Sequence, residues 1–179
     1  MRLSLLILPL TTTLLPLASA AITWTLVNRN ATPTPDETDA YARITDAITT
    51  ALARWAPHHP RITKALRVSY APGVPTAEAN YNGDVRFGSN RAYMNERTAL
   101  HEISHTLGIG QTAAFFDRCD RSDWPAATRF LQSVDGADAR LNCGGGHVWP
   151  YGLNYDSEFS ETNAERHVQL IVAMLEDGM

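Results

Sequence analysis

The segment TALHEISHTLGIG, residues 98–110, constrains this chain more than any other part of it. His101 and His105 lie four residues apart, so on an α-helix both imidazoles leave the same face and can bind one metal ion. Glu102, one position further round, would lie beside that metal and could accept a proton from a bound water. The pattern predicts a metal-binding helix. The alternative is a surface helix that carries two histidines and no metal.

The surroundings of the pair favour the metal-binding helix. We expect this helix to span residues 93–107, because apolar residues recur on the side opposite the polar triplet. These apolar residues are Leu100, Ile103 and Leu107. Gly108 follows and is suited to the left-handed conformation that ends many helices. The helix should therefore stop just after His105.

The first twenty residues have the composition of a secretory signal peptide. Arg2 gives a positive start, an apolar stretch follows, and Ala18-Ser19-Ala20 forms a small-residue cleavage site. The alternative is a membrane anchor, but two prolines break the apolar stretch, which is also short for a bilayer span. We expect residues 1–20 to be removed and residues 21–179 to form one secreted, extracellular domain.

Charge and length limit the partners of this domain. Removal of the signal peptide takes one arginine with it, so the formal net charge changes from −4 to −5. No basic run and no basic patch with aromatic residues remains, which argues against nucleic acid as a partner. No later segment is long and apolar enough to span a membrane. The length suits a single domain with its own core, which we expect to be a monomer.

The chain contains two cysteines, Cys119 and Cys143. In an oxidising compartment we expect them to form one disulfide bond, which would close a loop over the region after the metal helix. The alternative is that they are thiolate ligands of zinc. We favour the disulfide because two exposed thiols in a secreted chain usually oxidise.

Apolar periodicity predicts further strands and helices, and hence an α+β fold. The expected elements are a strand over 22–27, a helix over 35–55, a strand over 66–70, a hairpin over 77–87 that turns at Asn82-Gly83, and a helix from the N-cap Ser160 to about Glu176. An exposed strand edge in the hairpin could bind an extended peptide through backbone hydrogen bonds. The alternative is an ordinary edge hairpin without a ligand.

Two motifs in this chain resemble those of the metzincins, a family of zincin metallopeptidases. HEISHTLGIG resembles the start of the signature HExxHxxGxxH, with Gly108 as its glycine, but Gln111, a poor zinc ligand, occupies the third-ligand position. YGLNY, residues 151–155, resembles the Met-turn beneath the metal, with Leu153 in place of Met. Tyr155 stands where some members carry a tyrosine that contacts the metal or the intermediate. The resemblance implies a zincin-like domain with a small mixed sheet, an active-site helix and a C-terminal helix.

A catalytic zinc ion usually has three protein ligands and a water, so a third ligand is needed. The stretch HVWPYGLNYDSE is similar to one in secreted zincin-like proteins of bacteria and fungi, where a His before WPYGLNY is available to complete the site. We therefore predict His147, whose preceding glycines would let the loop return over the metal. Asp156 and Glu158 are alternatives, because a carboxylate can replace an imidazole, and Gln111 comes last. The other histidines are expected to be surface or packing residues: His58, His59 and His167.

These residues lead to the hypothesis of a secreted zinc metalloprotease that hydrolyses protein or peptide substrates. Zn²⁺ held by His101, His105 and His147 would polarise the scissile carbonyl and lower the pKa of its bound water. Glu102 would accept the proton of that water and pass it to the leaving amine. Tyr155, if it is not simply a core residue, would donate a hydrogen bond to the developing oxyanion.

Two other functions remain open at this point. The chain could be a secreted binding or effector protein that keeps zinc for stability, with a fourth protein ligand such as Asp156 closing the site. It could also be a zinc amidase that acts on cell-wall peptides. The few residues between the signal peptide and the first strand leave no room for a pro-segment of usual size, so we expect the protein to be active without processing. Because the ligand imidazoles must be neutral, we expect activity to fall in mildly acidic solution.

Overall fold

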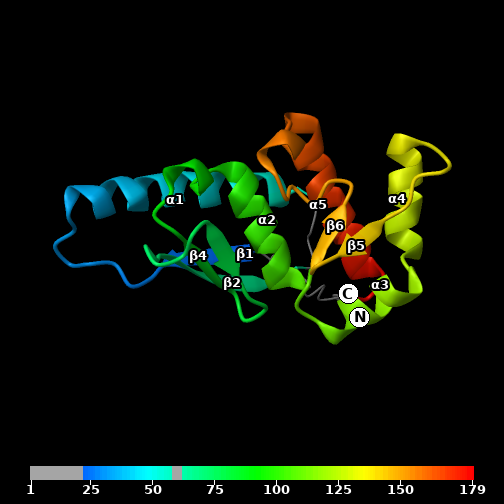
Figure 1. The fold of residues 1–179 in the computed structure, drawn as a ribbon, viewed down its shortest axis with the longest axis horizontal. Helices are drawn as coiled ribbons and strands as arrows, with labels where there is room; N and C mark the ends of the chain where they lie inside the picture. Colours follow the sequence, from blue (N-terminus) through cyan, green and yellow to red (C-terminus); the bar gives the residue numbers. More distant parts are fainter. Residues whose placement is uncertain (1–21, 58–61) are drawn as a thin grey trace, which may run out of the picture.

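The main sheet has four strands in the order β1-β2-β4-β3. The computed structural model describes residues 22–57 and 62–179 (Figure 1). In it β1 (Ile22–Leu26) and β4 (Asp84–Phe87) both pair in parallel with β2 (Lys64–Tyr70). The short β3 (Ala77–Ala79) pairs antiparallel with β4 and forms one edge of the sheet. The mixed sheet and the helices packed on it confirm the predicted α+β class.

Some predictions fall on parts of the chain outside the described residues. These are the signal peptide, residues 1–20, and the surface or packing role of His58 and His59. Among the helices in the described ranges, none combines the length and the apolar character needed to cross a bilayer. Secretion therefore stays a prediction.

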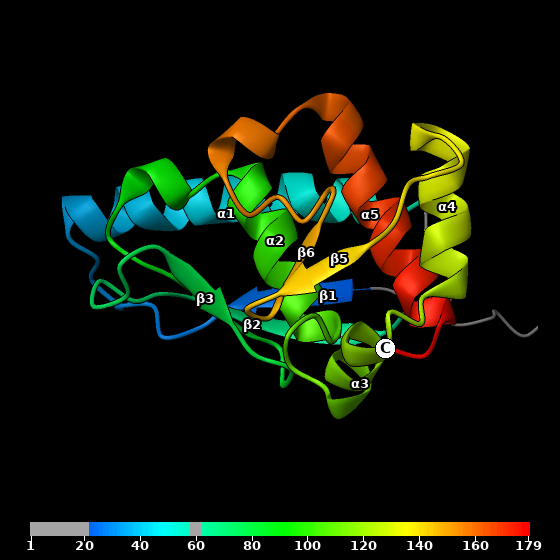
Figure 2. The same ribbon diagram turned by 45° about the vertical axis from the view of Figure 1, so that its right-hand side comes forward.

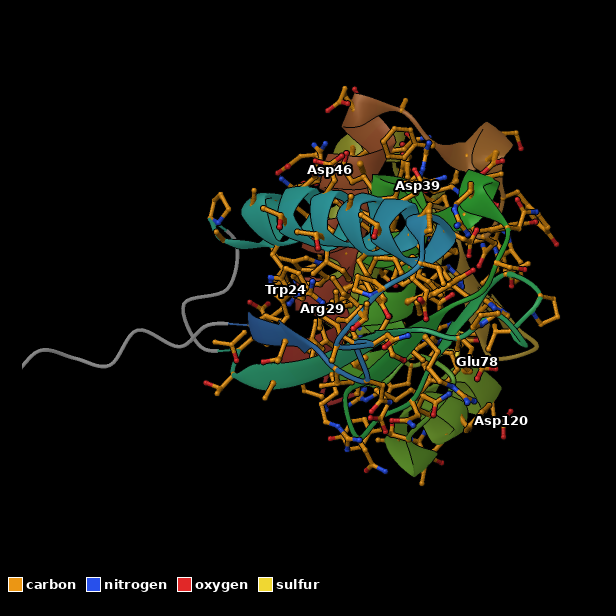
Figure 3. The ribbon with its side chains drawn as sticks, turned by 90° about the vertical axis from the view of Figure 1, so that its left-hand side faces the viewer. Trp24, Arg29, Asp39, Asp46, Glu78 and Asp120 are labelled. Carbon is orange, nitrogen blue, oxygen red and sulfur yellow. A yellow bond between two sulfur atoms is a disulfide. The ribbon has the colours of Figure 1, made fainter. Side chains whose placement is uncertain are left out.

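Helix α1 (Pro35–Trp55) begins and ends where the sequence predicts. Thr34 and Glu37 form a capping box, in which the Thr34 side chain accepts from the Glu37 amide and the Glu37 carboxylate accepts from the Thr34 amide at 2.7 Å. Its apolar face is buried against the sheet and the other helices. Figure 3 shows Arg29 near this helix, and its guanidinium lies 5.3 Å from the centre of the Tyr41 ring.

Helix α2 carries the histidine pair and spans Glu96–Leu107. The predicted start at residue 93 is wrong, because the side chain of Asn95 accepts a hydrogen bond from the Thr98 amide and caps the helix there. Residues 91–93 instead form a short 3-10 turn, Arg91–Tyr93. The predicted end is confirmed: Gly108 has φ 136° directly after the last helical residue. The apolar stripe of α2 is buried, as expected.

Several elements between residues 113 and 158 were not predicted. They are α3 (Ala113–Arg121), α4 (Pro125–Asp135), β5 (Asn142–Gly144), β6 (His147–Trp149) and the 3-10 turn Asp156–Glu158. The strands β5 and β6 pair antiparallel in a separate two-stranded sheet. Helix α4 receives its N-terminal cap from Asp177, whose carboxylate accepts from the amides of Ala126 and Ala127 at 2.7 and 3.0 Å.

The C-terminal helix α5 spans Glu161–Glu176 behind Ser160, which caps it as predicted. It packs against α4 and α2 (Figure 2). His167 on α5 is a fully buried packing residue. Its Nδ1 lies 2.7 Å from the Tyr151 carbonyl oxygen and its Nε2 lies 3.1 Å from the Leu100 carbonyl oxygen. A neutral ring has one N–H, so His167 donates to one of these oxygens at a time while it contacts both α2 and the loop after β6.

Burial lowers the pKa of His167 to about 4, which makes fold stability depend on pH. The unfolded chain has an ordinary histidine pKa near 6.5, so between these values it binds the proton that the folded protein excludes. The contribution is complete above about pH 6.5 and is lost as the pH falls toward 4. Between pH 7 and pH 5 we expect the metal-free protein to lose about 2 kcal/mol more unfolding free energy than His167→Gln, whose amide does not titrate.

Urea unfolding of both proteins at the two pH values, with chelator present, measures this difference. Titrating groups that do not interact with His167 contribute equally to both proteins and cancel in the comparison. Equal losses in the wild type and in His167→Gln would contradict the prediction.

Candidate metal centre

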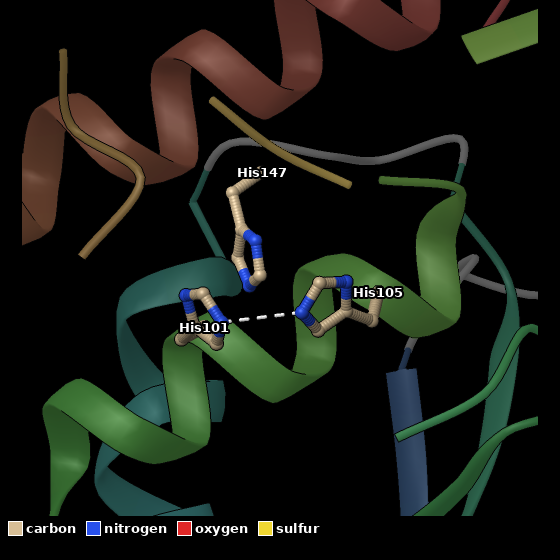
Figure 4. Close-up of side chains that lie close together, drawn as sticks. All are labelled: His101, His105 and His147. Carbon is tan, nitrogen blue, oxygen red and sulfur yellow. Dashed lines mark hydrogen bonds between the residues drawn. The ribbon is translucent and has the colours of Figure 1, made fainter. Parts of the chain in front are cut away.

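His101 and His105 face each other from successive turns of α2, with their Nε2 atoms 3.1 Å apart (Figure 4). On the other side of each ring, Nδ1 lies 2.8 Å from a backbone carbonyl oxygen, that of Gly152 for His101 and that of Ile109 for His105. A carbonyl oxygen only accepts, so Nδ1 must carry the hydrogen in both rings. In the neutral rings both Nε2 atoms therefore present bare lone pairs to each other.

Burial keeps these two rings neutral. It lowers the pKa of His101 to about 3, with a further lowering from the neighbouring His105, and it also lowers the pKa of His105. Two opposed lone pairs repel unless a cation lies between them. In a tetrahedral zinc site, two imidazole nitrogens at normal bond lengths lie about 3.3 Å apart. The observed spacing and the hydrogen bonds to carbonyl oxygens both fit metal-binding histidines.

The structure brings His147 to the same place. Its ring is stacked on that of His101 at a centroid distance of 5.2 Å and lies 5.4 Å from that of His105. The ligand atoms of the three residues all lie within 4.8 Å of one another, so the cluster could hold a metal ion. His147 begins β6 and pairs with Gly144 across a two-residue turn. Both turn residues, 145 and 146, are glycines with positive φ, as this type of hairpin requires.

The alternative third ligands have other partners. Asp156 pairs with the Arg97 guanidinium, at 2.7 Å from Nε, and Glu158 accepts from the Asn154 amide at 2.8 Å. Neither carboxylate belongs to the group of three histidines that, among the described residues, could hold a metal ion. Gln111 lies in the lining of the cavity around the histidines.

The hairpin that carries His147 is fastened to the rest of the molecule at two points. The predicted disulfide is present and joins Cys119 of α3 to Cys143 of β5, which leaves no thiolate for a metal. Cys143 pairs with Val148, the residue after His147. The hairpin turn also touches the loop after α2, where a Cβ on Gly110 would lie 2.3 Å from the Gly146 carbonyl oxygen. The position of His147 therefore depends on contacts that are distant in sequence.

Glu102 is 5% exposed and lies in the lining of the same cavity as the three histidines. Burial, with a smaller contribution from the charge of Glu78, raises its pKa to about 8, and Arg97 partly offsets this. Its Oε2 is buried and has no hydrogen-bond partner among the described residues. Buried polar atoms rarely lack a partner, so this oxygen is available to a water or a ligand. A cation bound nearby would favour the ionised carboxylate.

The cavity has a volume of about 420 Å³ and opens between α2, the β3 edge and the segment after β6. Tyr155 lines it and is 63% exposed, so the interpretation of Tyr155 as a core residue is wrong. Arg97 also lines the cavity although it is almost wholly buried, and it was not among the predicted site residues. Its position four residues before His101, on the same helix face, was the signal that could have pointed to it.

Comparisons with known proteins add no relative: no family model, no curated protein and no solved structure matches this chain. The interpretation of the cluster therefore rests on its geometry and chemistry. The likeness to metzincins stays a resemblance of two motifs.

Removal of the disulfide should weaken metal binding. An isolated two-stranded hairpin is only marginally stable in water, so without the Cys119–Cys143 bond His147 should leave the cluster part of the time. For Cys119→Ser/Cys143→Ser we expect zinc affinity to fall about tenfold or more, in the range seen when supports of metal ligands are removed.

Competition with a chromogenic chelator measures the affinity. His147→Ala in the oxidised protein is the matched control and should show at least as large a loss. If the loss comes from the displacement of His147, combining the cysteine and histidine changes should add little. Unchanged zinc affinity in the folded Cys119→Ser/Cys143→Ser protein would show that the disulfide does not hold His147 at the cluster.

Proposed function

We propose that this chain is a zinc metallopeptidase that hydrolyses peptide bonds with a metal-activated water. The observation that carries the proposal is the pair of bare Nε2 atoms on His101 and His105, which line a cavity together with Glu102, whose Oε2 has no partner among the residues that the structure describes. His101, His105 and His147 would hold the zinc, which when bound would acidify a water and polarise a carbonyl. Three protein ligands leave a coordination position open, as in catalytic rather than structural zinc sites.

Glu102 is suited to the role of general base. It follows His101 directly in α2, and its Oε2 has no partner in the described protein. Its burial means that a proton taken from water is held in a weakly polar environment, which favours later transfer to a leaving amine. The carboxylate would thus act twice, first accepting and then donating the same proton.

The edge strand β3 supports a peptide as the substrate. The Thr76 carbonyl accepts from the Gly88 amide at 2.7 Å, and the Asn80 amide donates to the Asp84 carbonyl at 3.1 Å. In an antiparallel pair the bonded residues alternate, so the backbone groups of Ala77 and Ala79 point away from β4. These two residues also line the cavity. An extended peptide could pair with this edge and lie across the metal cluster.

Tyr155, another residue of the cavity lining, would complete the site. Its side chain is largely exposed at the cavity, so its hydroxyl can reach a bound substrate without displacing core residues. A phenol donates one hydrogen bond and could stabilise the oxyanion that develops on the scissile carbonyl.

Glu102→Gln separates metal binding from catalysis. Because the amide has nearly the same shape but cannot take a proton, we expect full zinc occupancy and a fall in kcat/KM of about 10²- to 10⁴-fold. Hydrolysis of a quenched fluorescent peptide library and metal analysis of the same preparation give the two readings.

Glu176→Gln is the control, because Glu176 is an exposed carboxylate at the end of α5 outside the cavity lining, and we expect its kcat/KM to stay at the wild-type value. Wild-type kinetics in the Glu102→Gln protein would refute the base role. A wild type that binds zinc and cleaves no peptide would favour the binding or effector protein instead.

His147→Ala tests the third ligand. With two imidazoles left we expect zinc to be lost to a chelator that the wild type resists, and hydrolysis to be lost with it. Gln111→Ala, which changes another residue of the cavity lining, should keep zinc at one ion per chain. Metal analysis after dialysis against the chelator measures the zinc that each variant retains. If His147→Ala retains one tightly bound zinc ion per chain, another residue is the third ligand.

A further inference from the structure

Arg97 is a buried arginine whose hydrogen bonds all stay within the protein. It lies on α2, one turn before His101, and is 6% exposed. Its Nη1 donates to the Leu153 carbonyl at 3.0 Å, and its Nη2 donates to the Thr98 hydroxyl at 3.0 Å. Its Nε lies 2.7 Å from the Asp156 carboxylate, so the guanidinium charge is neutralised within the structure.

Two of these partners belong to one loop, residues 151–156, which contacts His101 and lines part of the cavity. In this loop the Gly152 carbonyl accepts the Nδ1 hydrogen of His101. Leu153 and Asp156, the two anchors of Arg97, lie on either side of Tyr155 in the sequence. A single guanidinium therefore holds the stretch that orients one histidine and presents the cavity tyrosine.

The backbone of this loop needs such an anchor. Tyr151 and Leu153 have φ values of 63° and 56°, in the left-handed region that residues with a side chain rarely adopt. Backbone strain of this kind persists only where the surroundings hold it in place. Leu153 is fully buried and its carbonyl is the one that Arg97 binds. Without Arg97 the loop would lose a contact that holds Leu153 in this strained conformation.

We propose that Arg97 is a positioning residue of the metal centre, which clamps the 151–156 loop so that Gly152 fixes the His101 ring and Tyr155 stays at the cavity. The inference rests on the proposed metal site and deepens it. Arg97 acts through the loop rather than on a substrate, because its guanidinium is almost wholly buried, donates from both Nη atoms to protein groups and is paired with the Asp156 carboxylate.

The test measures zinc affinity and the visible spectrum of the cobalt-substituted protein, two readings that need no catalysis. For Arg97→Met we expect zinc affinity to fall about 10- to 100-fold, as for other residues that orient metal ligands, with a changed cobalt absorption band. Arg97→Lys should show a smaller loss, because a single ammonium cannot bond Leu153 and Asp156 in the same planar geometry. Arg43→Met is the control, since it breaks an exposed ion pair with Asp39 on α1 and should change neither reading.

Asp156→Asn extends the test without risk to folding, because the Asp156 side chain is 75% exposed. It should weaken zinc binding a few-fold and should have little further effect in the Arg97→Met protein. If Arg97→Met does not fold, Asp156→Asn and Arg97→Lys give the same answer. Wild-type zinc affinity and an unchanged cobalt spectrum in the folded variants would overturn the proposal and leave Arg97 with a purely structural role.

The outcomes separate this inference from the proposed function. If the wild type binds zinc but cleaves no peptide, the peptidase proposal fails, and the affinities of the Arg97 variants still decide the role of the clamp. If peptides are cleaved, Arg97→Met should lower kcat more than it raises KM, because it displaces Tyr155 and the His101 ring. A wild type that binds no zinc would overturn both proposals.

Discussion

Two imidazole lone pairs are directed at each other across 3.1 Å, and a hydrogen bond to a backbone carbonyl fixes the orientation of each ring. This arrangement is unfavourable without a cation, because both rings are kept neutral by burial. Much of the surrounding structure can be understood as the support of this pair. The loop after α2 supplies the Ile109 carbonyl, and the loop after β6 supplies that of Gly152.

The supports come from distant parts of the chain and converge on α2. The disulfide and the contact between Gly110 and Gly146 hold the hairpin with the third histidine. His167 of the C-terminal helix lies between the Leu100 carbonyl of α2 and the Tyr151 carbonyl and can donate a hydrogen bond to either one. A metal site with so many fixed neighbours would be largely preformed, so little of the binding free energy of the metal would be used to order its ligands.

The sequence predicted best what depends on neighbouring residues. The ends of α1 follow from nearby prolines, Pro35 at its first position and Pro57 two residues after its last, and the structure adds a capping box at the start. The histidine pair follows from one helical turn. Helix α4 and the β5–β6 hairpin were missed because their supports are remote: the α4 cap is Asp177, fifty residues away, and the hairpin strands have three residues each. For the same reason the pattern of residues suggested His147 only by resemblance.

The sequence did not predict the parts of the site that depend on backbone groups or charged side chains from distant segments of the chain. The carbonyl oxygens that orient the histidines carry no residue signature. In the sequence, Arg97 has the pattern of an exposed polar residue on an amphipathic helix. Its role is visible only in the fold, where it contacts Leu153 and Asp156 of the 151–156 loop. The absence of a partner on Glu102 Oε2 is likewise visible only once the chain is folded.

X-ray absorption spectroscopy of the zinc-loaded protein tests the central claim most directly, because it reports the atoms bonded to the metal. If the opposed Nε2 atoms share one zinc, the spectrum should show three imidazole ligands and at least one oxygen ligand, all at about 2.0–2.1 Å. A zinc environment made only of oxygen atoms, or one with fewer than two imidazoles, would contradict the account.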